Sequence, residues 1–264
     1  MKLPHFLCPK HKCDLIRLGQ KNDGGYSIPK KSLSDTDVIL GFGLSDDWSF
    51  EKEFRKLSGA KVVCYDLSVN LKYWVVRFCK DVINMLLLRK GIIGSFKKFI
   101  TYFQYIIFFD GNKKIHEKKI IAPKHQRIHG VKQSDITDLN EILSEKNFSN
   151  FFLKIDIEKH EYRILDQIIK YQLRITGLVI EFHDCDFHFE TIKNFIDKLE
   201  LQLVHIHVNN YGDINKSGFP TVIELTFSPK SYNVNRDNKE KKFPVPGLDQ
   251  PNNKNRKDED IVFE

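Results

Sequence analysis

The sequence predicts an α/β protein whose strands form one doubly wound sheet, and three observations support this fold class. Apolar runs of strand length alternate with amphipathic runs of helix length along most of the 264 residues. The first strand–helix–strand unit has short loops, which require a crossover between parallel strands. Polar residues directly follow several predicted strands, at the edge where open α/β sheets bind their ligands.

The first strand–helix–strand unit is compact. Residues 37–42 form an apolar run that ends in a Gly-Phe-Gly turn, which predicts the first strand. Residues 48–57 have the spacing of a short amphipathic helix that stops at Gly59. Residues 60–65 predict a second strand, and Asp66 follows it directly.

A basic segment interrupts the alternation after the second strand. We predict that residues 68–125 form an insertion of two or three helices, with breaks near residues 91–94 and 110–112. The formal net charge is +7, but residues 68–134 contain 14 Lys/Arg and 3 Asp/Glu, so the basic surplus is local. This charge suits a lid or cap that attracts a phosphate-bearing acceptor.

Two apolar stretches of this insertion, residues 82–88 and 99–109, are too short for a membrane-spanning helix. A cap packed on its own domain is the favoured interpretation. An amphipathic segment that makes peripheral contact with a membrane surface stays open as the alternative.

The remaining elements continue the alternation. We predict one domain over residues 1–228, followed by a polar tail over residues 229–264 for which disorder is the default expectation. A tail packed on the domain stays open, because residues 261–263 have the composition of a short edge strand. The elements predicted after the insertion are a weak strand at 127–131, a helix capped by Ser134 that runs to Leu143, a strand at 151–157, a helix through Tyr162 and Ile169, a strand at 175–182, a helix at 189–199, and strands at 203–208 and 221–227.

The turn after the first strand is the first candidate for ligand binding. Gly41 and Gly43 leave room for a ligand at the backbone, and Asp66 lies where an acidic residue holds ribose hydroxyls in nucleotide-binding units. A dinucleotide fingerprint needs a third glycine where this sequence has Asp46, and Asp47 adds a second carboxylate that repels a pyrophosphate. A cationic, phosphate-free nucleoside such as S-adenosylmethionine fits this pattern. A tight turn with solvated acids is the structural alternative.

Carboxylates and imidazoles follow the later strands. Asp156 and Glu158 share one face of the fourth strand by the two-residue period, His183 follows the fifth strand, and His207 lies on the sixth. The carboxylates suit three roles: they can orient a substrate hydroxyl, hold the ammonium of the cofactor, or bind a divalent ion such as Mg²⁺ or Mn²⁺. Either histidine has the residue type of a general base.

Several of these motifs resemble one known family. The sequence is similar to the FkbM-type branch of class I S-adenosylmethionine-dependent methyltransferases over most of its length, except for the insertion. Segments 205–210 and 220–227 are similar to a subset found in bacterial surface-glycan pathways, such as capsule polysaccharide biosynthesis. The resemblance rests on Asp23-Gly24-Gly25-Tyr26, Gly41-Phe42-Gly43, Asp47-Trp48-Ser49-Phe50-Glu51, Asp66, Leu153-Lys154-Ile155-Asp156-Ile157-Glu158, His160-Glu161 and Glu181-Phe182-His183, whereas Lys159 stands where the family usually has glycine.

This resemblance implies a Rossmann-like, seven-stranded sheet with the last strand antiparallel. It also implies O-methylation of a sugar hydroxyl, with a small-molecule or nucleotide-linked sugar as acceptor. Gly41 and Gly43 would then form the cofactor loop together with Asp47, Asp66 would bind the ribose, and Asp156 would lie between cofactor and acceptor.

Methyl transfer to a sugar hydroxyl needs a base, because the hydroxyl is a poor acid. We expect His183 or His207 to be this base, with Asp156 and Glu158 orienting it or the substrate. A divalent metal ion, Mg²⁺ or Mn²⁺, is an additional expectation for the same residues.

Other functions stay open. An RNA methyltransferase would use the basic insertion, although the sequence contains no evident RNA-binding motif, so we expect no nucleic-acid partner. A non-catalytic glycan-pathway partner would keep the fold without turnover, and an NAD-linked enzyme is disfavoured by the incomplete glycine fingerprint. The five scattered cysteines and the lack of a secretory signal lead us to expect a cytoplasmic protein.

Overall fold

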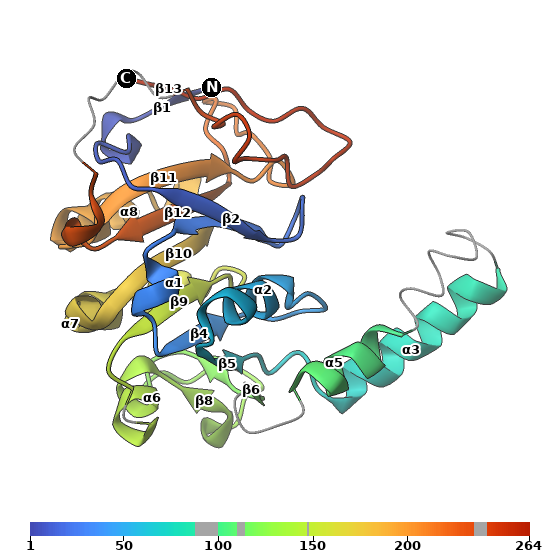
Figure 1. Ribbon diagram of the computed structural model, residues 1–264. Helices are drawn as coiled ribbons and strands as arrows, with labels where there is room; N and C mark the ends of the chain where they lie inside the picture. Colours follow the sequence, from blue (N-terminus) through green and yellow to red (C-terminus); the bar gives the residue numbers. More distant parts are fainter. Residues whose placement is uncertain (88–99, 110–113, 147, 235–241) are drawn as a thin grey trace.

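The computed structural model describes residues 1–87, 100–109, 114–146, 148–234 and 242–264. Its main sheet has seven strands in the order β11-β12-β10-β9-β4-β5-β6 (Figure 1). Neighbouring strands are parallel, except that β12 is antiparallel to both β10 and β11. This sheet confirms the predicted doubly wound, Rossmann-like α/β fold of seven strands, with one strand antiparallel to its neighbours. The strands are β4 (Val38–Phe42), β5 (Lys61–Tyr65), β6 (Lys114–Glu117), β9 (Phe151–Ile155), β10 (Ile175–His183), β11 (Gln202–Val208) and β12 (Val222–Ser228).

The sheet is covered on both faces, which explains the nearly continuous apolar runs of its central strands. Alternate residues of β4 belong to different cores: Leu40 lies in one, and Ile39 in the other. The core around Leu40 is closed by helices α6 (Leu139–Lys146), α7 (Leu165–Tyr171) and α8 (Phe189–Lys198). The core around Ile39 is closed by α2 (Ser49–Ser58) and the hairpin β2 (Leu15–Gly19)–β3 (Gly25–Pro29), with α1 (Ser32–Asp35) following the hairpin (Figure 1).

Short elements complete the fold. Two small parallel pairs join β1 (Lys2–Leu3) to β13 (Val262–Phe263) and β7 (Ile120–Ile121) to β8 (Ile136–Thr137). The 3-10 helices are η1 (His5–Leu7), η2 (Gln133–Asp135), η3 (Glu161–Arg163), η4 (Gln172–Arg174), η5 (Cys185–Phe187) and η6 (Lys230–Tyr232).

The insertion contains helices α3 (Leu71–Leu86) and α5 (Thr101–Phe109), which project from the domain (Figure 1). The breaks predicted near 91–94 and 110–112 fall outside the described residues. The insertion is shorter than predicted, because β6 belongs to the main sheet and the boundary at residue 125 is therefore wrong.

Two predictions next to the insertion are also wrong. Residues 127–131 form no strand. The third strand of the main sheet in chain order is β6 instead, and it lies at the edge of the sheet beside β5. Ser134 does not cap the following helix, because α6 begins at Leu139 and the Asp138 carboxylate accepts the backbone N–H of Glu141 at 3.0 Å.

The tail is ordered over residues 242–264, so the default expectation of disorder is wrong there. Phe243, Asp249 and Asn252 are buried. The strand expected at 261–263 exists as β13, but it pairs with β1 instead of extending the main sheet. Within the described part of the chain, no helix is both long and apolar enough to cross a bilayer.

Candidate active site

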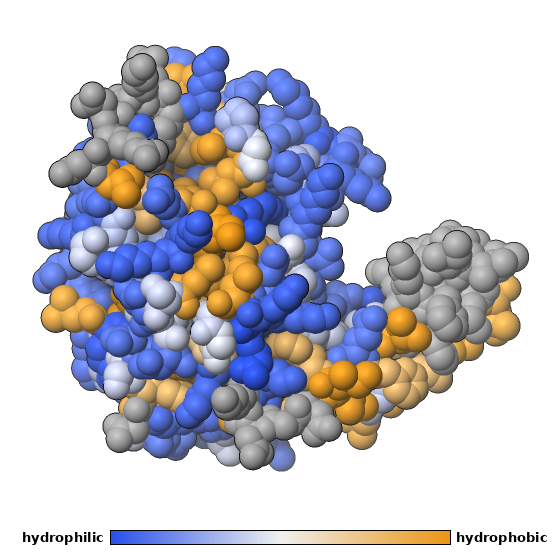
Figure 2. Space-filling model, in the orientation of Figure 1, coloured by the Kyte–Doolittle hydropathy of each residue, from blue (hydrophilic) through white to orange (hydrophobic). Residues whose placement is uncertain are grey.

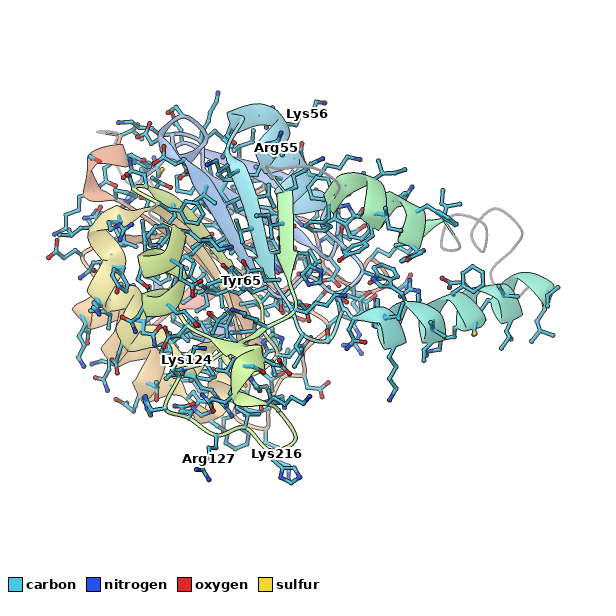
Figure 3. The ribbon with its side chains drawn as sticks, turned by 90° about the horizontal axis from the view of Figure 1, so that it is seen from below. Arg55, Lys56, Tyr65, Lys124, Arg127 and Lys216 are labelled. Carbon is cyan, nitrogen blue, oxygen red and sulfur yellow. The ribbon has the colours of Figure 1, made fainter. Side chains whose placement is uncertain are left out.

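A cavity of about 730 Å³ opens beyond the carboxyl ends of β4, β5 and β9. This size is typical of sites for small molecules and cofactors. One of its residues, Tyr65, ends β5 and lies near the centre of the view in Figure 3. The cavity is lined by Asp23, Gly24, Tyr26, Gly43, Leu44, Ser45, Asp47, Phe50, Glu51, Tyr65, Asp66, Leu67, Ser68, Asn70, Lys119, Ile120, Ile121, Lys154, Asp156, Ile157, Glu158 and His160.

The two glycines of the predicted cofactor loop have different roles in the structure. Gly43 lines the cavity with φ +84°, and a Cβ there would overlap the carbonyl oxygen of Asp156. Gly41 lies outside the lining of the cavity. Glu51 Oε1 lies only 2.8 Å from the position that a Cβ at Gly41 would occupy, so the glycine makes room for the Glu51 carboxyl group. Both glycines therefore permit close packing between chain segments, and only Gly43 presents its backbone to a ligand.

Asp66 holds the loop that follows β4. Its carboxylate accepts the backbone N–H groups of Leu44 at 2.9 Å and Ser45 at 3.1 Å, and that of Ser68 at 2.8 Å. Burial alone would raise the pKa of Asp66, but a hydrogen bond from the Ser68 hydroxyl at 2.6 Å and these backbone hydrogen bonds outweigh it and hold the pKa below its ordinary value. An ionised carboxylate thus lies at the end of β5, where the sequence predicts the ribose partner.

Asp47 lies on the opposite side of the same turn. Its Oδ1 accepts the Ser49 N–H at 2.9 Å, in the first turn of α2. Its Oδ2 occupies the place that a side chain at Gly24 would need, where φ is +80°. Burial raises the pKa of Asp47. Asp47 therefore joins α2 to the β2–β3 hairpin, which covers this end of the sheet.

Three further side chains in the cavity were not predicted as site residues. Glu51 is buried, and its Oε1 has no hydrogen-bond partner. Burial raises the pKa of Glu51 to about 7, against the opposing effect of Lys154. Lys154 donates to the Gly43 carbonyl at 2.9 Å, and the Tyr26 hydroxyl donates to Asp156 at 3.0 Å. The motif Lys154-Ile155-Asp156 was the available signal for Lys154.

The structure brings Asp156, Glu158 and His183 together. One ligand atom of each lies within 4.8 Å of the others. The predicted reason is wrong, because β9 ends at Ile155 and Glu158 has φ +51°, so Glu158 reaches the cluster through a turn and not along a strand face. Lys159 follows with φ +76°, a conformation that explains why glycine would serve at this position.

His183 is surrounded by carboxylates. Its Nδ1 lies 3.0 Å from Glu161, and its Nε2 lies 3.3 Å from Glu181 and 3.5 Å from Glu158. Burial alone would lower the pKa of His183, but hydrogen bonds to Glu161 and Glu181 raise it to about 11. His183 is therefore protonated near neutral pH as long as these carboxylates are not neutralised by another cation.

The structure places His207 elsewhere. It is buried on β11 between Glu224 at 3.3 Å and Asp258 at 3.1 Å, and it does not line the cavity. Burial alone would lower the pKa of His207, but these partners raise it to about 10. His207 thus joins the tail to the sheet, at a distance from the cluster of Asp156, Glu158 and His183.

The cavity as a whole is acidic. Its lining includes the carboxylates of Asp23, Asp47, Glu51, Asp66, Asp156 and Glu158, against the amines of Lys119 and Lys154. A diphosphate would be repelled by this lining, whereas a cationic ligand would be attracted.

No protein-family model matches the sequence, and no curated protein matches it. Solved structures align with most of the chain at low similarity. Precorrin-6y C5,15-methyltransferase from Geobacter metallireducens GS-15 has 13% identity and a TM-score of 0.31, over 75% of this chain and 85% of that chain. A putative tRNA (m1A22) methyltransferase from Streptococcus pneumoniae, in complex with S-adenosyl-L-methionine, has 10% identity and a TM-score of 0.34, over 76% and 73%. An S-adenosylmethionine-dependent methyltransferase from Methanosarcina mazei has 9% identity and a TM-score of 0.34, over 75% and 95%. Likeness at this level carries no argument about activity or substrate.

Proposed function

We propose that this protein is an S-adenosylmethionine-dependent O-methyltransferase that acts on a sugar hydroxyl, either of a free or of a nucleotide-linked sugar. The observation that carries the proposal is the acidic cavity at the carboxyl ends of β4, β5 and β9. S-adenosylmethionine combines ribose hydroxyls with a sulfonium and an ammonium group, and it has no phosphate. The charge of the lining favours such a ligand over a dinucleotide.

Residues around the turn after β4 are suited to hold the cofactor. Asp66 has the place and the ionised carboxylate for ribose hydroxyls. Glu51 Oε1 and the Tyr65 hydroxyl are buried at the cavity without a partner, so a polar ligand would relieve two unsatisfied groups. The bound cofactor supplies a methyl group on carbon already activated by sulfur, and the protein then has to position the acceptor and remove its proton.

Asp156, Glu158 and His183 are suited to the acceptor side. We propose that they hold a divalent ion, Mg²⁺ or Mn²⁺, because carboxylate and imidazole ligands lie within 4.8 Å of one another and would bring excess negative charge to neutralise. A bound ion lowers the pKa of a coordinated hydroxyl. With such an ion bound, His183 would be a ligand and not the base, the proton of the acceptor hydroxyl would pass to solvent, and two neighbouring hydroxyls of a sugar would be suitable oxygen ligands.

Calorimetry with S-adenosylmethionine and adenosylhomocysteine tests the cofactor site. We expect binding to the wild-type protein and at least tenfold weaker binding to Asp66→Asn, since a charge-assisted hydrogen bond is lost. Asp166→Asn, at an exposed carboxylate of α7, is the matched control and should bind normally. Binding of NAD in preference to S-adenosylmethionine would contradict the proposal.

Mass spectrometry of candidate sugars and nucleotide sugars, incubated with the protein and cofactor, tests the transfer. A mass gain of one methyl group supports the proposal. Cofactor binding without transfer to any sugar would instead support a non-catalytic partner, and methylated RNA with salt-sensitive RNA binding would support an RNA methyltransferase.

Binding of Mn²⁺ to the metal-free protein, followed by electron paramagnetic resonance, tests the ion site without an activity assay. We expect binding in the wild type and in the control Glu190→Gln, at an exposed carboxylate of α8, and its loss in Glu158→Gln and His183→Ala. Activity that survives thorough chelation but is lost in His183→Ala would return the role of base to His183.

A further inference from the structure

Helices α3 and α5 form an arm that stands clear of the sheet in two views at right angles (Figures 1 and 3). Aromatic packing fixes the base of this arm. Trp74 is 5% exposed and lies 4.9 Å from the ring of Tyr105, which in turn lies 5.9 Å from Trp48 of the domain. Arg77 adds ion pairs to Asp46 of the domain and to Asp81 of its own helix. The arm is therefore held to the domain at its base.

Both helices of the arm expose large apolar side chains along their length. On α3, Leu71 is 68% exposed, Val75 54%, Ile83 50% and Leu86 72%. On α5, Phe103 is 51% and Ile107 71% exposed. Figure 2 shows the corresponding hydrophobic colour gathered on the projecting arm. Soluble proteins rarely expose a contiguous apolar surface without a partner.

The apolar residues of α3 occupy one side of the helix. At 100° per residue, Leu71, Val75 and Leu86 fall within a sector of about 60°, and Ile83 extends it to about 120°. Phe103 and Ile107 are spaced by four residues and share a face of α5. This arrangement is that of an amphipathic surface element and not of a helix buried all round.

The charge around this surface is positive. Lys72 lies in the apolar sector of α3, Lys80 lies about 60° beyond its edge, and both are exposed. The acidic residue of these two helices, Asp81, is 4% exposed and is paired with Arg77 at 3.2 Å. In the sequence, residues 71–109 contain seven Lys/Arg and one Asp.

We propose that the arm binds the surface of a bilayer that contains anionic lipids, with the apolar faces of α3 and α5 at the level of the headgroups. An apolar face flanked by lysines is attracted both by the acyl boundary and by negative headgroups. A second copy of this chain would bring the same positive charges face to face, so charge complementarity favours the lipid surface. Neither helix is long and apolar enough to span the bilayer, so the contact is peripheral.

Sedimentation of the full-length protein with vesicles tests this proposal. We expect binding to vesicles of phosphatidylcholine with 30% phosphatidylglycerol, and much weaker binding to phosphatidylcholine alone. Added salt should weaken the binding. Lys72→Gln and Lys80→Gln should each weaken it about fivefold, and the pair Ile83→Gln and Leu86→Gln at least tenfold.

The matched control is the pair Leu173→Gln and Phe187→Gln, which removes apolar side chains that are 83% and 82% exposed outside the arm. It should bind vesicles as the wild type does. Circular dichroism checks that all variants are folded. Equal binding of the arm variant and the control would overturn the proposal. So would a wild-type dimer that ignores vesicles and dissociates in Ile83→Gln and Leu86→Gln, because the arm would then bind a second copy.

Discussion

At the scale of single residues, the candidate site requires a glycine at position 43, where any side chain would clash with its surroundings. Gly43 has φ +84°, and because it has no Cβ, the residue after β4 can pack directly against the carbonyl group of Asp156, the residue after β9. Lys154 reinforces this contact by donating to the Gly43 carbonyl at 2.9 Å and by lying 3.4 Å from Asp156. The carboxylates of the cavity are therefore positioned by the backbone at this junction.

Gly43→Ala should destabilise the protein by about 3 kcal/mol, because the new Cβ overlaps the Asp156 carbonyl in addition to the cost of the positive φ. Gly218→Ala separates the two effects, since Gly218 has φ +83° with open space around its Cβ position. We expect it to cost only about 1 kcal/mol. Urea denaturation measures both values, and equal costs would contradict the steric account.

Glu51 provides a prediction about pH. Its pKa of about 7 means that apo-protein stability falls as pH rises from the ordinary carboxyl value through 7, because a buried carboxyl group whose Oε1 has no partner must then ionise. A cationic ligand binds the ionised form, so affinity for S-adenosylmethionine should rise over the same range. Glu51→Gln should make the apo-protein more stable at pH 8 and bind the cofactor roughly tenfold more weakly there, with little change at pH 5.

Calorimetry at pH 5 and pH 8, together with urea denaturation of the apo-protein, measures both effects. Glu53→Gln is the control on the same helix, because Glu53 accepts the Gly19 N–H outside the cavity. A Glu51→Gln protein with the pH profile of the wild type would show that Glu51 does not face the ligand.

At the scale of elements, the strands of the main sheet that are buried on both faces were predictable, and its exposed edge strand β6 was not. The runs that became β4, β9 and β10 are apolar almost throughout, as two covered faces require. In contrast, β6 is an edge strand of Lys, Ile, His and Glu in which Ile115 is 41% exposed, so its sequence has no apolar run.

The residues of the candidate site also fall into a group that the sequence predicted and a group that it did not. Asp156 directly follows β9 and His183 is the last residue of β10, and this position at a strand end made both residues candidates. Glu51 and Lys154 lie inside a helix and a strand, where a polar residue usually faces solvent. Only the structure shows that both are buried, Glu51 at 1% and Lys154 at 6% exposed. The acidic cavity could therefore be predicted in part, and its two buried, opposite charges could not.

The contact between β11 and the tail provides a prediction about stability. His207 joins Glu224 of β12 to Asp258 of the tail, and its pKa of about 10 is well above the ordinary histidine value. A raised histidine pKa stabilises the folded state fully below pH 6.5, and this contribution is lost as pH rises through about 10.

Urea denaturation between pH 6 and pH 10 should therefore show a steeper loss of stability in the wild type than in His207→Gln, with the variant about 2 kcal/mol less stable at pH 6. His129→Gln, at an exposed position, should follow the wild-type profile. Parallel profiles for wild type and His207→Gln would mean that the imidazolium does not stabilise the tail.

At the scale of the whole molecule, residues far apart in the sequence close the side of the sheet that β11 borders. The first and last strands pair in parallel beside β11 (Figure 1), and the tail residues Asp249 and Asp258 contact the histidines of β11. The Asp249 carboxylate lies 3.0 Å from His205, and Asn252 donates to Glu224 at 2.7 Å. The polar composition that predicted disorder is thus explained, because the Asp249 carboxylate and the Asn252 amide N–H group bind partners 44 and 28 residues away.

The tail should consequently contribute to global stability and not only to local order. Phe243 is 3% exposed and lies with its ring 5.9 Å from His205 and 5.7 Å from Phe263, so Phe243→Ala should cost about 3 kcal/mol of unfolding free energy. Val262→Ala, at a residue of β13 that is 60% exposed, should change the unfolding free energy by less than about 0.5 kcal/mol.

Urea denaturation monitored at the same time by far-ultraviolet circular dichroism and by the fluorescence of Trp48, in a Trp74→Phe background, reports on the whole sheet. A single shifted transition is expected, since the tail and the sheet share one core. Loss of the tail in a separate early transition, with the sheet unfolding at the wild-type midpoint, would mean that the tail is an independent attachment.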